Sequence, residues 1–66
     1  MQVVANGEEV ALGEEATLTD LLEALGLGPK WVVAEVNGVA VDRADMPSVV
    51  LSDGDRVELV RAVAGG

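Results

Sequence analysis

The sequence lacks cysteine, histidine, tyrosine and phenylalanine, and these absences narrow what the protein can do. Without cysteine it has no thiol nucleophile, no disulfide and no cysteine-ligated zinc site. Without histidine it has no imidazole acid–base pair. The nucleophiles that remain show no activating base beside them; they are Ser48, Ser52, Thr17, Thr19 and Lys30. We therefore expect no catalytic residues, and any part in chemistry would be that of a protein substrate or carrier.

Basic residues are scarce. The sequence contains four Lys and Arg residues and 12 Asp and Glu residues, which gives a formal net charge of −8. Nucleic acids and anionic membranes attract basic surfaces, so neither is an expected partner. The acidity either keeps a small apolar domain soluble or speeds the encounter with a basic partner, and the composition leaves both open.

The chain also lacks a long apolar run and a basic N-terminal segment. Its 66 residues, half of them hydrophobic, suffice for one domain with one core. Without a membrane-spanning stretch, a signal peptide or cysteines, a cytoplasmic location is expected.

Two Asn-Gly dipeptides predict two β-hairpins. The first, Asn6-Gly7, joins an alternating stretch at residues 2–5 to a second arm at residues 8–12. The other, Asn37-Gly38, joins a strand at residues 31–36 to one at residues 39–41. A further strand is expected at residues 56–63, after a turn at residues 52–55 and a short helical turn at residues 42–46.

A leucine stripe predicts one helix at residues 18–25, because Leu18, Leu21, Leu22 and Leu25 recur at helical spacing. Thr17 is a suitable N-cap, with Asp20 three positions later completing a capping box. Gly26 stands where a left-handed C-cap belongs.

These elements predict an α+β fold of the β-grasp (ubiquitin-like) class. It has a mixed sheet of four to five strands, covered on one face by one main helix. The first and last strands would lie side by side and parallel at the centre of the sheet. The whole chain, residues 1–66, would form this single domain, with residues 64–66 as a flexible C-terminal tail.

The printed sequence ends in Gly65-Gly66. A diglycine has no side chains, so it fits a narrow channel and adopts backbone angles closed to other residues. The last carboxylate would be its chemical handle. The competing interpretation is a frayed end without a role.

With these features the sequence resembles the ubiquitin-like sulfur carriers, and among them the ThiS family of thiamine biosynthesis. The resemblance spans the chain and rests on both Asn-Gly turns, the helix, the stretch at residues 53–58 and the ending at residues 63–66. Related carriers for molybdopterin synthesis or tRNA thiolation, and ubiquitin-like protein modifiers, remain alternatives.

The resemblance implies a chemistry centred on Gly66. A ThiF-like adenylating enzyme would use MgATP to convert the Gly66 carboxylate into an acyl-adenylate, and a persulfide donor would replace AMP with sulfur. A ThiG-like thiazole synthase would then take the sulfur from the resulting thiocarboxylate. Gly65 would thread the tail into these enzymes, and the carrier itself would bind no cofactor.

A docking surface for these partners is expected on the sheet face away from the helix. Strand alternation places both Val4 and Val60 on that face, where they would form one apolar spot near the root of the tail. Arg61, next to the tail, would position it or pair with an acid of a partner. Trp31, the one aromatic residue, is expected to pack at the start of its strand.

Overall fold

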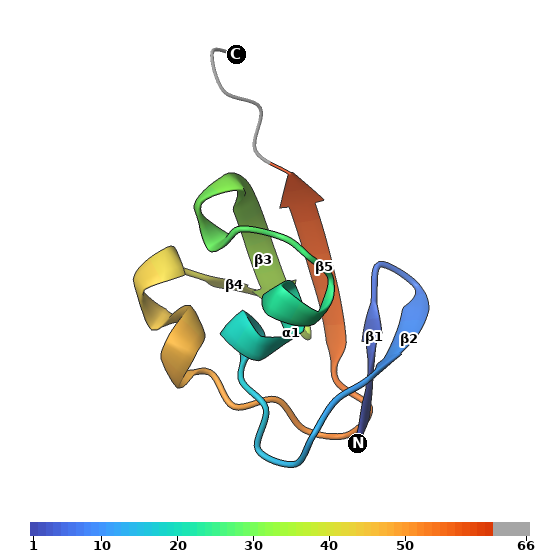
Figure 1. Cartoon of the computed structure of the whole chain (residues 1–66). Helices are drawn as coiled ribbons and strands as arrows, with labels where there is room; N and C mark the ends of the chain where they lie inside the picture. The colour runs from blue at the N-terminus through green and yellow to red at the C-terminus, as the bar shows by residue number, and fades with distance from the viewer. Residues whose placement is uncertain (62–66) are drawn as a thin grey trace.

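The computed structural model describes residues 1–61, and these residues form a five-stranded sheet with one α-helix on one face (Figure 1). Along the chain the elements are β1 (Gln2–Ala5), β2 (Glu8–Ala11), α1 (Leu18–Ala24), the 3₁₀ turn η1 (Pro29–Trp31), β3 (Val32–Val36), β4 (Val39–Val41), the 3₁₀ turn η2 (Arg43–Ser48) and β5 (Arg56–Arg61). The strand order is β2-β1-β5-β3-β4. Strands β1 and β5 are parallel and the other pairs are antiparallel. This confirms the mixed sheet with a parallel central pair that the sequence predicts.

Both hairpins turn at the predicted dipeptides. Asn6 and Gly7 have φ of 49° and 83°, and Asn37 and Gly38 have φ of 50° and 84°. Positive φ at both central residues is the geometry of a type I′ turn, whose twist matches that of the flanking strands. Asparagine tolerates this left-handed conformation better than most residues with a side chain.

Helix α1 begins and ends through local side-chain and backbone chemistry. Thr17 Oγ1 accepts a hydrogen bond from the Asp20 N–H at 3.2 Å, and Asp20 Oδ2 accepts one from the Thr17 N–H at 2.8 Å. At the other end Gly26 has φ of 72°, and the Leu27 N–H donates to the Leu22 carbonyl at 2.8 Å. These are the predicted capping box and a Schellman ending.

One residue of the leucine stripe departs from its predicted place. Leu18, Leu21 and Leu22 are fully buried against the sheet, but Leu25 is 40% exposed. The helix ends at Ala24, one residue earlier than predicted. After the left-handed turn at Gly26 the chain folds Leu27 back onto the core, in place of Leu25.

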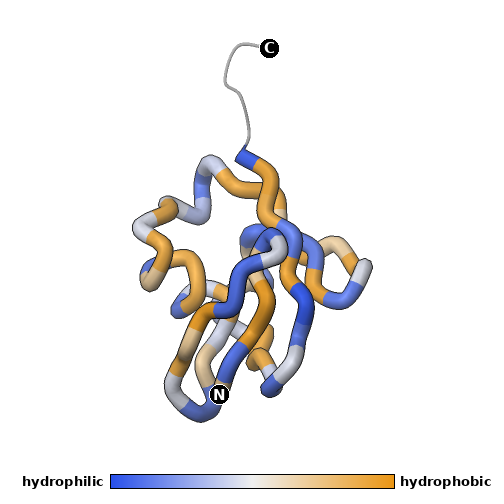
Figure 2. The backbone as a smooth tube through the Cα atoms, turned by 90° about the vertical axis from the view of Figure 1, so that its right-hand side faces the viewer, coloured by the Kyte–Doolittle hydropathy of each residue, from blue (hydrophilic) through white to orange (hydrophobic). Residues whose placement is uncertain are grey.

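The core lies between α1 and the sheet, and buried residues alternate with exposed ones along β1, β3 and β5. Hydrophobic and hydrophilic positions follow one another along the backbone in Figure 2. The core is entirely apolar and consists of Val3, Ala5, Leu18, Leu21, Leu22, Val32, Ala34, Met46, Leu51, Val57 and Leu59. Met46 is 1% exposed although its segment appears polar in the sequence. The turn η2 packs beside α1, and Met46 is its one buried residue and part of the core.

The predicted start of the third strand needs correction, and the predicted end of the last strand lies outside the described residues. Trp31 belongs to η1 rather than to the start of β3, and it is 48% exposed instead of packed inside. Pro29 favours the tight turn that precedes the strand. The last strand is described as far as Arg61. Residues 62–63 of the predicted strand and the predicted tail at residues 64–66 lie outside the described residues.

Candidate functional site

Strand β5 positions the candidate site, since it leads toward Gly65 and Gly66, which both lie outside the described residues. It runs through the centre of the sheet between β1 and β3. Its alternation buries Val57 and Leu59 and leaves Arg56, Glu58 and Val60 on the opposite face. We call this second face, away from α1, the open face.

Two asparagine side chains from the hairpin turns hold β5 in place. Asn6 Oδ1 accepts a hydrogen bond from the Leu59 N–H at 2.8 Å, and Asn6 Nδ2 donates to the Leu59 carbonyl at 3.0 Å. Asn37 Oδ1 accepts one from the Arg56 N–H at 3.0 Å. The backbone N–H of each asparagine also donates to a β5 carbonyl, that of Val57 for Asn6 and that of Arg56 for Asn37. Backbone and side chain together extend the strand ladder into the turn. The position of β5 therefore depends on both hairpins.

The turn before β5 is fixed by its two aspartates. Asp53 Oδ1 accepts a hydrogen bond from the Gln2 N–H at 2.7 Å. Asp55 accepts one from the Ser52 N–H at 2.8 Å and another from Asn37 Nδ2 at 3.0 Å. These bonds tie the turn to β1 and to the second hairpin, just before β5 begins. Among residues 1–61 no group of three or more His, Cys, Asp or Glu side chains is placed to hold a metal ion.

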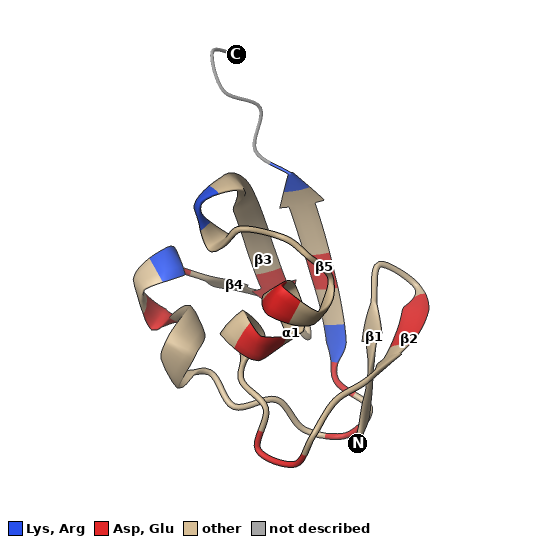
Figure 3. Cartoon of the chain, in the orientation of Figure 1, with Lys and Arg blue, Asp and Glu red and all other residues tan. Residues whose placement is uncertain are grey.

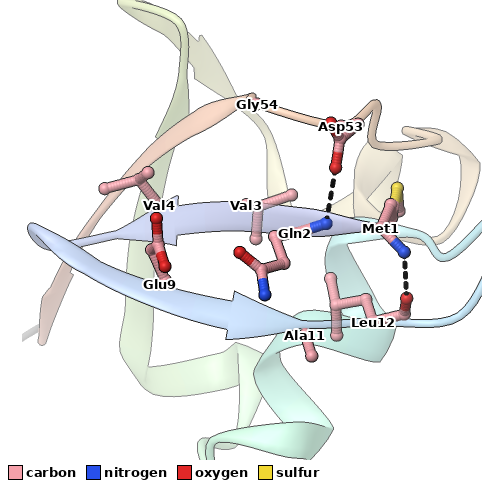
Figure 4. A pocket seen from close by; sticks show the side chains of 9 residues that line it. All are labelled: Met1, Gln2, Val3, Val4, Glu9, Ala11, Leu12, Asp53 and Gly54. Carbon is pink, nitrogen blue, oxygen red and sulfur yellow. Dashed lines mark hydrogen bonds between the residues drawn. The ribbon is translucent and has the colours of Figure 1, made fainter.

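An open depression of about 440 Å³ lies at the end of the sheet where β1 begins (Figure 4). Its walls come from β1, β2 and the turn before β5, with Glu9 and Asp53 as their charged residues. Two hydrogen bonds join residues of its walls, one from the Gln2 N–H to Asp53 Oδ1 and one from the Met1 ammonium to the Leu12 carbonyl. Since β5 runs parallel to β1, the end of β5 that leads to Gly66 lies at the other side of the molecule.

The predicted docking residues Val4 and Val60 both lie outside the core, but they do not form one spot. Val60 is 63% exposed on the open face, and Val4 is partly buried on the same face. Val4 lies opposite Arg56, at the start of β5, whereas Val60 lies opposite Val33 of β3. Val60 lies four positions after Arg56 along β5, which is about 13 Å. The apolar neighbour of Val60 is therefore Val33, which is 55% exposed.

Arg61 is exposed at the end of β5, as expected for a residue next to the tail. It lies opposite Val32, whose side chain is buried on the α1 side. By strand alternation Arg61 leans toward that side, so it does not share a face with Val60. A role for Arg61 in positioning the tail stays a prediction.

The open face beside Val60 also contains a feature that the sequence pattern did not reveal. Glu35 of β3 lies directly opposite Glu58 of β5. Figure 3 shows acidic positions on both strands. Alternation alone places both side chains on the open face. Only the strand register, which the sequence does not supply, makes them neighbours.

Within residues 1–61 no helix is long and apolar enough to cross a membrane.

A mixed five-stranded sheet with a parallel central pair and one helix across it defines a β-grasp protein, the class to which ubiquitin-like proteins belong. The chain belongs to the ThiS family, whose model matches residues 1–66.

Solved structures agree with this assignment. A crystal structure of the thiamine biosynthesis protein ThiS from Geobacter metallireducens superposes with a TM-score of 0.81 at 32% identity, and the match covers all of both chains. A solution NMR structure of a thiamine biosynthesis protein from the same organism gives a TM-score of 0.78 at 30% identity, over all of this chain and 88% of the other.

A longer protein also contains a similar region. The protein named thiazole synthase from Paramagnetospirillum magneticum is 35% identical over all 66 residues of this chain. The chain spans about a fifth of that protein's length, since the match covers 20% of it.

Proposed function

We propose that this protein is a sulfur carrier of thiamine synthesis that acts through the carboxylate of Gly66. The observation that carries the proposal is the match to the ThiS family over the whole chain, together with a ThiS structure of the same fold and extent. In this role the protein is a substrate of other enzymes and supplies no catalytic residue.

The proposed chemistry follows from the reactivity of a carboxylate. A terminal carboxyl group has a pKa near 3.5, so it is ionised at neutral pH and is a poor electrophile. A ThiF-like adenylating enzyme would join it to the AMP moiety of MgATP and release pyrophosphate. The terminal sulfur of a persulfide donor would then attack the acyl carbon and displace AMP, which gives an acyl disulfide. A thiol reductant would cleave its S–S bond, so that Gly66 keeps the sulfur as a thiocarboxylate and the reductant and donor sulfurs end as a disulfide. MgATP is thus a substrate of the partner and not a cofactor of this chain.

The composition supports placing the sulfur at the terminal carboxylate. The sequence contains no cysteine, so no side-chain thiol can carry sulfur as a persulfide. Gly65, without a side chain, would let the chain pass a narrow entrance to the partner's active site. We propose a cytoplasmic location as well, because the adenylating enzyme needs MgATP.

A ThiG-like thiazole synthase would be the acceptor of the sulfur. The support is the Paramagnetospirillum magneticum protein named thiazole synthase, of which a region similar to this whole chain forms a part. A carrier and a synthase that share one polypeptide meet at high effective concentration. We propose the same pairing for this chain.

The test is a reconstitution followed by mass spectrometry. The chain is incubated with its adenylating partner, MgATP, a persulfide donor and a thiol reductant, and the intact mass and the fragments are measured. The expected result is the exchange of one oxygen for sulfur on Gly66, and no change when MgATP is left out. Sulfur on an internal residue, or an unchanged mass in the complete mixture, would refute the proposal.

A further inference from the structure

The open face carries two cross-strand pairs side by side, one apolar and one acidic. Val33 lies opposite Val60, and both are more than half exposed. The next pair on this face is Glu35 opposite Glu58, and both residues are exposed. The two pairs bring exposed methyl groups next to two carboxylates.

The acidic pair is unfavourable within the isolated chain. The Asn37 N–H donates to the Arg56 carbonyl, so by alternation Glu35 and Glu58 also form a hydrogen-bonded antiparallel pair. In such a pair the Cα atoms lie about 5.5 Å apart. Like charges in directly opposite positions destabilise a sheet.

Neighbouring charges relieve this repulsion in part. Arg56 is the nearest basic position on the open face, two residues before Glu58 and diagonal to Glu35, at a Cα distance of about 7–8 Å. On the other side of Arg56, Val4 of β1 lies between Arg56 and Glu9 of β2. A cation placed between the carboxylates of Glu35 and Glu58 would turn their repulsion into attraction.

The face also lies within reach of the reactive residue. Val60 precedes Gly66 by six residues, so a fully extended chain would span at most about 20 Å between them. A protein docked on the two pairs would therefore have Gly66 within reach of a nearby active site.

We propose that this surface, the Val33–Val60 pair with the Glu35–Glu58 pair, docks the thiazole synthase through apolar side chains flanking an arginine or lysine. The inference rests on the proposed function, and it adds where the partner binds and with what chemistry. Charge complementarity supports it, since the acidic pair and the net charge of −8 both favour a basic contact. A second copy of this chain is a poor occupant, because a symmetric contact would bring four carboxylates together.

The experiment measures binding of the unmodified chain to the thiazole synthase encoded in the same genome, by isothermal titration calorimetry. Glu58→Gln and Glu35→Gln should each weaken binding at least about threefold. The same substitutions should raise the Tm by roughly 1–8 °C, since they remove a like-charge pair from a small domain. A purely structural role would move stability and binding in the same direction, whereas the proposal requires opposite directions.

Matched controls separate local contact from overall charge and hydrophobicity. Glu23→Gln makes the same change in net charge on α1, which covers the other face. Val50→Thr removes an exposed methyl group outside the strands, as Val60→Thr does on the open face. Both controls should bind like the parent chain, and Val60→Thr should bind more weakly.

Several results would overturn the inference. One is unchanged affinity of Glu58→Gln and Glu35→Gln, and another is equal weakening by Glu23→Gln. A dimer in sedimentation that is lost in Val60→Thr would assign the surface to a second copy instead. The reconstitution at Gly66 needs no thiazole synthase, so its failure is distinct from a failure here.

Discussion

The hydrogen bonds of Asn6 to β5 give the sharpest test of how this fold is held together. Strand β1 is registered with β5 only at Val4 and Ala5, and the Asn6 side chain extends the contact to Leu59. Asn6→Gly removes both side-chain hydrogen bonds but keeps a residue that adopts the φ of 49° without strain. Asn6→Ala removes the same bonds and adds the cost of a left-handed conformation.

The expected loss is large for a chain of this size. Two hydrogen bonds at about 0.5–1.5 kcal/mol each make the cost of Asn6→Gly about 1–3 kcal/mol. Asn6→Ala should cost about 1–2 kcal/mol more, the penalty for placing a Cβ in the left-handed region. For 66 residues the total stability is roughly 3–10 kcal/mol, so either change removes a substantial part of it.

The assay is urea unfolding followed by far-UV circular dichroism, with fluorescence of the single Trp31 as a second probe. Asn37→Gly is the comparison, because Asn37 has a φ of 50° and its side-chain bonds are exposed. The glycine entropy term is common to both variants and cancels. A free energy of unfolding for Asn6→Gly equal to that of Asn37→Gly, or within about 0.5 kcal/mol of the parent, would refute this account of β5.

Four further outcomes are expected. Leu22→Ala should lower the free energy of unfolding by about 2–5 kcal/mol, since the Leu22 side chain of α1 is fully buried in the core, and a loss below about 1 kcal/mol would contradict that packing. Glu15→Gly should raise the Tm, because Glu15 has a φ of 61° and a glycine there relieves about 1 kcal/mol of strain; a lower Tm would contradict this reading. Val60→Asp should fold normally, as judged by circular dichroism, because Val60 is 63% exposed, and an unfolded variant would show that its side chain is needed inside. One residue added after Gly66 should abolish ATP–pyrophosphate exchange by the adenylating enzyme without changing the Tm. It moves the carboxylate by about 3.5 Å, where active sites tolerate about 1 Å, so full exchange would exclude Gly66 as the reacting residue.

Local signals in the sequence predicted most of the elements correctly. The Asn-Gly turns, the capping box of Thr17 and Asp20, and the left-handed Gly26 all act through bonds between residues a few positions apart. Such features depend little on the rest of the fold, so they can be predicted from a short window. The alternation along β1 and β5 likewise predicted which side chains lie outside the core.

Predictions that depended on packing between distant segments were less accurate. Met46 is buried because η2 packs beside α1, and nothing in its polar surroundings indicates this. Leu25 follows the helical period but is exposed, because the helix ends before it and Leu27 packs against the core instead. Trp31 is half exposed because the chain enters β3 through a 3₁₀ turn.

The sequence by itself determined the turns, the helix caps, the β-grasp order of elements and the face on which each strand residue lies. Only the tertiary structure decided the register, which separates Val4 from Val60 and brings Val33 to Val60 and Glu35 to Glu58. A face follows from the two-residue period of one strand, which is a local property. Register depends on hydrogen bonds and packing between strands far apart in the chain, such as the bonds that join Asn6 to Leu59, and no local pattern contains that information.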